Sequence, residues 1–192
     1  YVPDDNFEQT LIDLGYDSPP LDNFVLTANI ENVVMLNLNG AGINDLTGIE
    51  DFEALEILHC NDNNLLSINV GQNSNLLELF VNLNNLTELD IANNGALRKL
   101  SCNFNNLLSL DITQNPDLRY IACTENNLSS LDVTQNVLLE ELYVINNQIT
   151  KIDFSQNGEL NSLLISQNEL SELDIFDNTK LEILKCDFNS LS

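Results

Sequence analysis

Hydrophobic residues recur along most of the chain at a fixed spacing of 21 residues. Each repeat follows the form LxxLxCxxNxLxxLDVxxNxx, and its first residue is Leu55, Leu76, Leu97, Leu118, Leu139, Leu160 or Leu181. We number the positions of the repeat from one at that Leu. No insertion or deletion interrupts the register, so each repeat predicts one coil of a solenoid.

Every coil contains two similar arms, because the apolar positions four and six and the Asn at position nine recur ten residues later. We call positions one to nine the first arm and positions eleven to nineteen the second arm. In Leu100-Ser101-Cys102 an apolar residue alternates with a variable one, which is the period of a strand with one buried face. We therefore expect two short parallel strands per coil, in a mostly-β solenoid with coils about 4.8 Å apart. The recurring Asn predicts a stacked ladder of side-chain amides.

The N-terminal segment has a different pattern and predicts a cap over residues 1–32, followed by repeats over 33–192. Residues 4–15 read as one helix, with acidic residues in its first turn and Gly15 at its end. Phe7, Leu11 and Leu14 share one face of that helix and are expected to cover the first coil. Residues 16–32 are expected to be irregular, and the first repeat, 33–54, has 22 residues. Since the chain stops inside a repeat at Ser192, we expect it to be part of a longer protein.

The phrase LxxLxCxxNxL resembles the signature of leucine-rich repeats, and its nesting with LDVxxN resembles the 21-residue IRREKO class. The resemblance covers residues 33–192 and is fullest over 118–136. Residues 2–17 and the Leu-Thr-Gly-Ile segment at 46–49 resemble the start of secreted or surface-anchored Bacteroidetes proteins. The resemblance implies a leucine-rich repeat solenoid that is secreted or at the cell surface and that binds or adheres to a partner. It says little about the ligand.

Composition narrows the function classes. The 192 residues include 30 Asp and Glu against 6 Lys and Arg, so the net charge is −24, which argues against binding nucleic acid or an anionic membrane. The chain is 43% hydrophobic, which excludes simple disorder, and no apolar run approaches the roughly 20 residues of a transmembrane helix. We expect a soluble, folded, acidic protein.

The four cysteines lie at position six, where other coils carry Val or Ile: Cys60, Cys102, Cys123 and Cys186. They are expected to be buried free thiols rather than metal ligands, because the first and last are six coils apart. Five Asp residues form a second row at position fifteen: Asp90, Asp111, Asp132, Asp153 and Asp174. We expect their carboxylates to accept local hydrogen bonds. Ca²⁺ bridging is the alternative, which we disfavour because the repeat lacks the glycine-rich nonapeptide of calcium-binding β-rolls.

The first-arm strand predicts the candidate binding surface, because its outward positions vary between coils and are rich in aromatic and basic residues. The candidate residues are His59, Phe80, Lys99, Arg119, Tyr120, Tyr143, Leu164 and Lys185. Lys99 and Arg119, with their neighbour Arg98, supply half of the chain's positive charge within two coils. An acidic group of a partner could dock there. At position eight, Leu83, Phe104 and Phe188 either belong to this surface or pad the edge of the core.

These patterns favour a non-catalytic extracellular module that recognises a protein partner, with no cofactor. His59 is the single His, and no neighbouring hydroxyl suggests a catalytic triad. Two alternatives stay open: a polysaccharide-binding module, since Tyr and Phe suit sugar rings, and a structural spacer for a missing C-terminal domain. Aromatic and aliphatic residues outside a core favour a partner that covers them.

Overall fold

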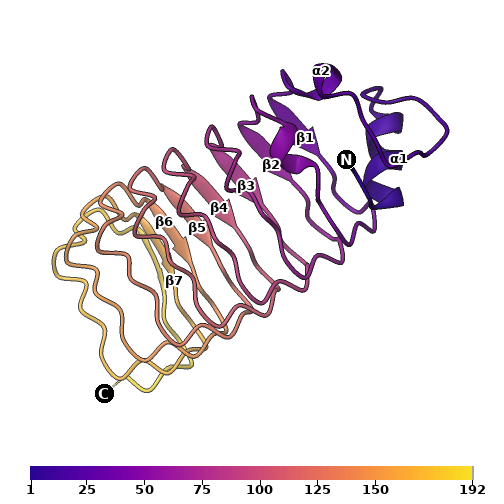
Figure 1. Ribbon diagram of the computed structural model, residues 1–192. Coiled ribbons are helices and arrows are strands. Elements are labelled where there is room, and N and C mark those ends of the chain that lie inside the picture. The colour runs from indigo at the N-terminus through magenta and orange to yellow at the C-terminus, as the bar shows by residue number, and fades with distance from the viewer. Residues whose placement is uncertain (192) are drawn as a thin grey trace.

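The computed structural model describes residues 1–191, which form a stack of coils with the two termini at opposite ends (Figure 1). Helix α1 (Asp5–Asp13) and helix α2 (Thr27–Ile30) lie at the N-terminal end. A 3₁₀ turn, η1 (Ile49–Asp51), belongs to the first repeat. The eight strands are β1 (Met35–Asn37), β2 (Ile57–His59), β3 (Glu78–Phe80), β4 (Lys99–Ser101), β5 (Tyr120–Ala122), β6 (Glu141–Tyr143), β7 (Ser162–Leu164) and β8 (Ile183–Lys185).

The strands form one parallel sheet in chain order, β1 to β8. Each strand pairs with the next in the register that the repeat predicts, so that Leu58 pairs with Leu79 and Leu79 with Leu100. Position four is fully buried from Leu58 to Leu163, including Leu142 at the middle of the stack, whereas Leu184 in the last coil is 39% exposed. The mostly-β solenoid with coils of about 21 residues is confirmed.

The prediction of a second strand in every coil is wrong. Within the described residues the second arm makes one isolated bridge, between Asn69 and Asp90, and no strand. Its backbone groups take local partners instead: the N–H of Asn94 donates to the carbonyl of Ile91, and that of Ala92 donates to the Asp90 carboxylate. Local hydrogen bonds of this kind compete with pairing between coils.

Two rows of buried Asn replace that pairing, one at position nine and one at position nineteen. Asn63 donates to the carbonyls of Leu38 at 2.8 Å and Cys60 at 3.1 Å, and accepts from the N–H of Ile43. Asn73 donates to the carbonyls of Ile49 and Phe52. Each amide thus joins two coils through buried backbone groups, and the position-nine Asn accepts from an N–H that would otherwise be unpaired in the core. The predicted amide ladder is confirmed.

The helical cap is present in part, as one short helix that begins one residue later and ends two residues earlier than predicted. Asp4 is its N-cap and accepts from the N–H groups of Asn6 and Phe7. Phe7 and Leu11 are buried in the same core as the coils, whereas Leu14 is 46% exposed because the helix ends before it. Residues 16–32, expected to be irregular, include the short helix α2.

The second carboxylate oxygen of Asp4 joins the cap to the first repeat. It accepts from the N–H of Asn44 at 2.9 Å and of Asp45 at 3.2 Å. One aspartate therefore caps α1 and anchors it to the loop that follows β1. No helix in residues 1–191 has the length and hydrophobicity needed to cross a bilayer.

Candidate functional site

One face of the sheet carries the candidate residues at positions three and five, while position four between them enters the core. We call this outward side, from β2 to β8, the sheet face. Its position-three residues are Ile57, Glu78, Lys99, Tyr120, Glu141, Ser162 and Ile183, and its position-five residues are His59, Phe80, Ser101, Ala122, Tyr143, Leu164 and Lys185. Aromatic, aliphatic and charged side chains therefore share a rigid, regularly spaced support.

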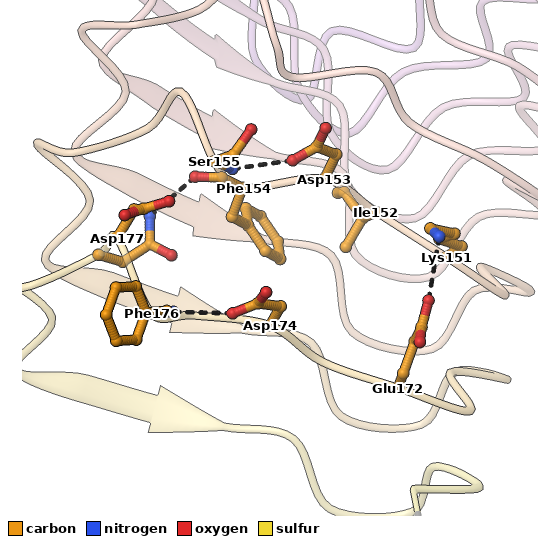
Figure 2. Close-up of a pocket in the computed structure, with 10 residues that line it drawn as sticks. Lys151, Ile152, Asp153, Phe154, Ser155, Glu172, Asp174, Phe176 and Asp177 are labelled. Atoms are coloured by element: carbon orange, nitrogen blue, oxygen red, sulfur yellow. Dashed lines mark hydrogen bonds and ion pairs between the residues drawn. The ribbon is translucent and has the colours of Figure 1, made fainter.

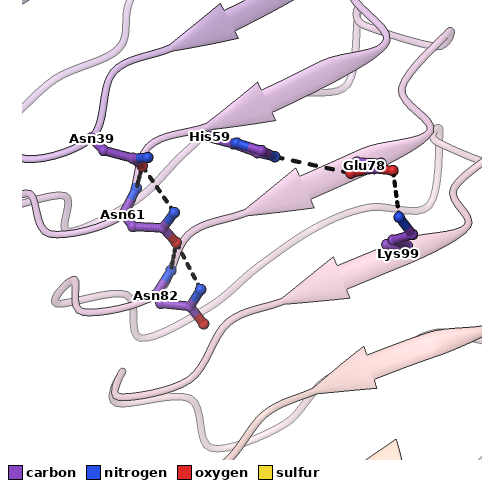
Figure 3. A network of polar contacts seen from close by, with 6 residues as sticks. All are labelled: Asn39, His59, Asn61, Glu78, Asn82 and Lys99. Atoms are coloured by element: carbon purple, nitrogen blue, oxygen red, sulfur yellow. Dashed lines mark hydrogen bonds and ion pairs between the residues drawn. The ribbon is translucent and has the colours of Figure 1, made fainter. Parts of the chain in front are cut away.

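The N-terminal part of the sheet face contains a stacked aromatic pair. The His59 imidazole lies on the Phe80 ring, with 4.5 Å between centroids and 2° between the ring planes. Figure 3 shows Glu78 between His59 and Lys99. The Glu78 carboxylate is 2.8 Å from Lys99 Nζ and 4.0 Å from His59 Nε2. Glu78, which the sequence did not single out, thus joins two of the candidate residues.

Tyr120 and Tyr143 form a second pair, one coil apart. Their rings meet edge to face, with centroids 5.5 Å apart and planes at 89°. Burial, reinforced by neighbouring Tyr143 and Glu141, raises the pKa of Tyr120. The hydrogen bond that the Tyr143 hydroxyl donates to Glu141 raises the pKa of Tyr143. Both phenols therefore stay protonated; Tyr120 can donate a hydrogen bond to a partner, whereas the Tyr143 hydroxyl already donates to Glu141 and can only accept.

The basic residues surround a hollow of about 390 Å³ at the start of β3 to β6. Its lining residues are Leu77, Glu78, Arg98, Lys99, Arg119, Tyr120, Glu140 and Glu141. Lys99 pairs with Glu78, and Arg119 pairs with Glu140 at 2.6 Å. Arg98 makes no ion pair within residues 1–191, so its guanidinium is free to bind an anionic group.

The structure separates the eight candidate residues into neighbouring and distant sets. His59 and Phe80 touch, and Lys99, Arg119 and Tyr120 line one hollow beside Tyr143. Leu164 and Lys185 lie on β7 and β8, further along the same face. Arg119 precedes β5 and lies at the edge of the sheet rather than on a strand.

A row of exposed and half-buried amides follows the strands at position seven (Figure 3). Asn61 donates its backbone N–H and side-chain amide to Asn39 Oδ1 at 2.7 and 2.9 Å, and Asn82 donates to Asn61 in the same way. The recurrence of Asn at position seven, at Asn61, Asn82 and Asn103, is the signal in the sequence that indicates this row. The row stiffens the edge of the sheet face.

Position eight has left-handed backbone in every coil after the first repeat. The residues are Asp62, Leu83, Phe104, Glu125, Asn146, Gln167 and Phe188, with φ between 54° and 57°. Leu83 is 52% and Phe104 50% exposed. About half of each of these two side chains is therefore in contact with solvent.

The Asp row on the second arm is held by local hydrogen bonds. Asp111 and Asp132 each accept from the backbone N–H and the hydroxyl of the Thr two residues later, at 2.7–2.9 Å. These hydrogen bonds lower the pKa of both carboxyl groups, and the bond from the hydroxyl has the larger effect. The expected local arrangement is confirmed. In the part of the chain that the structure describes, no three His, Cys, Asp or Glu residues are grouped to hold a metal ion.

A polar hollow of about 250 Å³ lies between two second arms near the C-terminal end. Figure 2 shows Lys151 paired with Glu172 at one side, and Asp153 and Asp174 bonded to the backbone N–H groups of Ser155 and Phe176. Because Lys151, Glu172, Asp153 and Asp174 already have partners, this hollow offers a ligand less than the one beside Arg98.

All four cysteines are free. Cys60, Cys102 and Cys123 are fully buried, as predicted for substitutes of aliphatic residues, and Cys186 is half-buried. Burial raises the pKa of Cys60 and of Cys102 to about 12. These thiols are core residues and are not poised as nucleophiles.

No protein-family model and no curated protein matches the sequence. Solved structures do match. The functional domain of InlJ from Listeria monocytogenes, described as including a cysteine ladder, has a TM-score of 0.81 and 32% identity, over 99% of this chain and 47% of that one. A leucine-rich repeat protein of Leptospira interrogans has a TM-score of 0.75 and 28% identity, over 80% of this chain and 42% of that one. This chain has the leucine-rich repeat fold.

The chain spans less than half the length of those two leucine-rich repeat structures. A complex of TLR13 with single-stranded RNA also matches, with a TM-score of 0.67 and 23% identity over 88% of this chain and 28% of that one. That similarity concerns the fold alone. The comparisons indicate no enzyme family.

Proposed function

We propose that this leucine-rich repeat chain is an exported, non-catalytic module that binds a protein partner through the sheet face. The observation that carries the proposal is that aromatic residues and four of the six cations, Arg98, Lys99, Arg119 and Lys185, lie on or at the edge of one rigid face of a protein with net charge −24. Half-exposed aromatics and a free Arg are typical of interface centres.

The two arms of the coil differ in a way that supports this face as the site. The second arm presents a repeated row of Asp and Ser or Thr whose polar groups bond one another. The sheet face instead changes from coil to coil and leaves Arg98 unpaired within residues 1–191. A variable, partly apolar surface suits recognition of one shaped partner better than does a uniform polar row.

Ring geometry favours a protein partner over a polysaccharide. A sugar platform needs aromatic rings that lie side by side in roughly one plane. His59 and Phe80 cover each other face to face, and Tyr120 meets Tyr143 at 89°. Nucleic acid is disfavoured by the charge of −24, since phosphate binding depends on basic surface.

The experiment is a binding screen of the purified chain against arrays of cell-surface proteins and of polysaccharides. Wild type is compared with Phe80→Ala/Tyr143→Ala on the sheet face and with Ser109→Ala/Ser130→Ala on the second arm as a matched control. We expect binding to a protein that the face variant loses and the control keeps, with no change when calcium is chelated.

Other outcomes would replace the proposal. Hits confined to polysaccharides would favour the glycan alternative, and loss on chelation alone would favour Ca²⁺ at the Asp row. No binding by wild type would favour a structural spacer. Export is tested separately by protease treatment of intact cells, which should degrade an exposed chain and spare an internal one.

A further inference from the structure

In two adjacent coils, the turn after the strand contains one exposed apolar residue whose placement does not stabilise the core. Leu83 and Phe104 occupy position eight of adjacent coils, beyond the edge of the sheet face. About half of each side chain is exposed, at 52% and 50%. They are neighbours in the stack, because the N–H of Leu83 bonds to the carbonyl of Asn103, directly before Phe104.

Their backbone conformation is unfavourable for such residues. Both have φ of 54°, in the left-handed region where a bulky side chain is strained. The stacked coils impose this turn everywhere, so only the residue type can vary. Gly40 takes this position in the first repeat, and Asp62 and Asn146 take it in other coils, which are the residue types that tolerate the conformation.

Leu83 and Phe104 therefore break two local rules at once, by being strained and by exposing apolar surface. Violations of local preference concentrate at functional positions, where another interaction compensates. Within residues 1–191 no other element covers the two side chains, and both stay half exposed.

Acidic residues bound this apolar pair on both sides. Along the same row Asp62 precedes Leu83, and Glu125 follows Phe104. Neither carboxylate has a cation within 4.0 Å in the described residues. The surface is thus an apolar centre between two negative charges, on a protein whose net charge of −24 attracts basic partners.

We propose that Asp62, Leu83, Phe104 and Glu125 form a second docking surface, which takes a protein segment with an apolar residue between basic residues. The apolar residue of the segment packs on Leu83 and Phe104, and its Lys or Arg neighbours pair with Asp62 and Glu125. This surface does not depend on the proposed role of Phe80 and Tyr143.

The test selects peptides from a phage-displayed random heptapeptide library on the wild-type chain and measures their affinity for variants. In Leu83→Asn/Phe104→Asn both positions carry Asn, the residue type that Asn146 provides at position eight of its own coil. Asp62→Asn/Glu125→Gln removes the flanking charges. Gln167→Asn changes the same position three coils beyond Phe104 and is the matched control.

We expect selected peptides to carry an aromatic or aliphatic residue flanked by Lys or Arg. The Leu83→Asn/Phe104→Asn variant should bind them at least tenfold more weakly, while its Tm stays the same or rises by up to about 4 °C as strain is relieved. The charge variant should bind more weakly at low salt and lose most of the salt dependence. The control and Phe80→Ala/Tyr143→Ala should bind as wild type does.

Three results would overturn the proposal. They are the absence of an enriched sequence, equal binding by Leu83→Asn/Phe104→Asn, and a Tm more than about 4 °C lower in that variant, which would show that the pair stabilises the fold. Loss of binding in Phe80→Ala/Tyr143→Ala would place the peptides on the sheet face instead, and so separates this proposal from the proposed function.

Discussion

The side-chain oxygen of Asn105 accepts a hydrogen bond of 3.0 Å from the backbone N–H of Leu86, in the preceding coil. This is the only partner of that buried N–H within residues 1–191. The position-nineteen row differs: Asn115 donates to the carbonyls of Ile91 and Asn94, and its own Oδ1 has no partner. The two Asn rows therefore contribute differently to stability.

Asn105→Ala should destabilise the chain more than Asn115→Ala. The first change leaves the Leu86 N–H buried without an acceptor, at a cost of about 1–3 kcal/mol. The second leaves no group unpaired, because Ile91 and Asn94 also accept from the backbone N–H groups of Asn94 and Leu97. Urea unfolding of both variants measures the difference in free energy. Equal values would show that the two rows act alike.

Gly48→Ala should loosen the N-terminal cap. Gly48 has φ of 105°, and a Cβ there would lie 2.7 Å from the Tyr1 carbonyl oxygen and 2.9 Å from Val2 Cγ2. Since Val2 is fully buried, the backbone at Tyr1 and Val2 must move to make room for the Cβ. We expect a lower Tm and faster hydrogen exchange in α1. Gly158→Ala, where a Cβ meets nothing within 4 Å, is the control and should melt as wild type does.

Alkylation should distinguish Cys186 from the other cysteines. Iodoacetamide reacts with thiolates, and Cys60 and Cys102 are buried with pKa values of about 12. At pH 8 we expect the native chain to be modified first at Cys186, which is half-buried, with the three buried thiols reacting after denaturation. Peptide mass spectrometry locates the label. Equal rates at Cys102 and Cys186 would contradict this packing.

The Asp row should make stability fall at acid pH. Asp132 has a folded-state pKa below its usual 3.8, because the Thr134 hydroxyl and N–H donate to it. A lowered folded-state pKa stabilises the fold above pH 3.8, and that contribution is lost as the pH falls through the folded-state value. Thr134→Val should raise the Asp132 pKa toward 3.8, as measured by carboxyl NMR titration. Thr87→Val is the control, and an unchanged Asp132 pKa in Thr134→Val would exclude the hydroxyl as the cause.

The repeat pattern predicted the core of the fold well. Leu100 and Leu142 at position four are fully buried, and the strands pair in the expected register. Such burial follows from the sequence because identical coils can stack only when the same apolar positions meet. The second arm shows the limit of that reasoning. Apolar and polar residues alternate in the second arm as they do in the first, yet it forms no strand in residues 1–191. The Asp90 carboxylate instead accepts a local hydrogen bond from the N–H of Ala92.

The candidate surface was predictable as a set of residues but not as an arrangement. The sequence indicated that Phe80, Lys99 and Tyr120 would face outward, because they alternate with buried positions. It did not indicate that Glu78 would pair with Lys99 or that Arg98 would be left without an ion pair in residues 1–191. Pairing depends on the reach of each side chain toward the adjacent coil.

Sequence periodicity alone specified the coil length, the inward positions and the Asn that closes each arm, because one repeating unit admits one stacking register. Folding added what no single coil contains: the sheet on one arm, the His59–Phe80 stack, and the left-handed turns that expose Leu83 and Phe104. These features depend on backbone conformation and on contacts across coils, and a linear pattern of apolar and polar residues encodes neither.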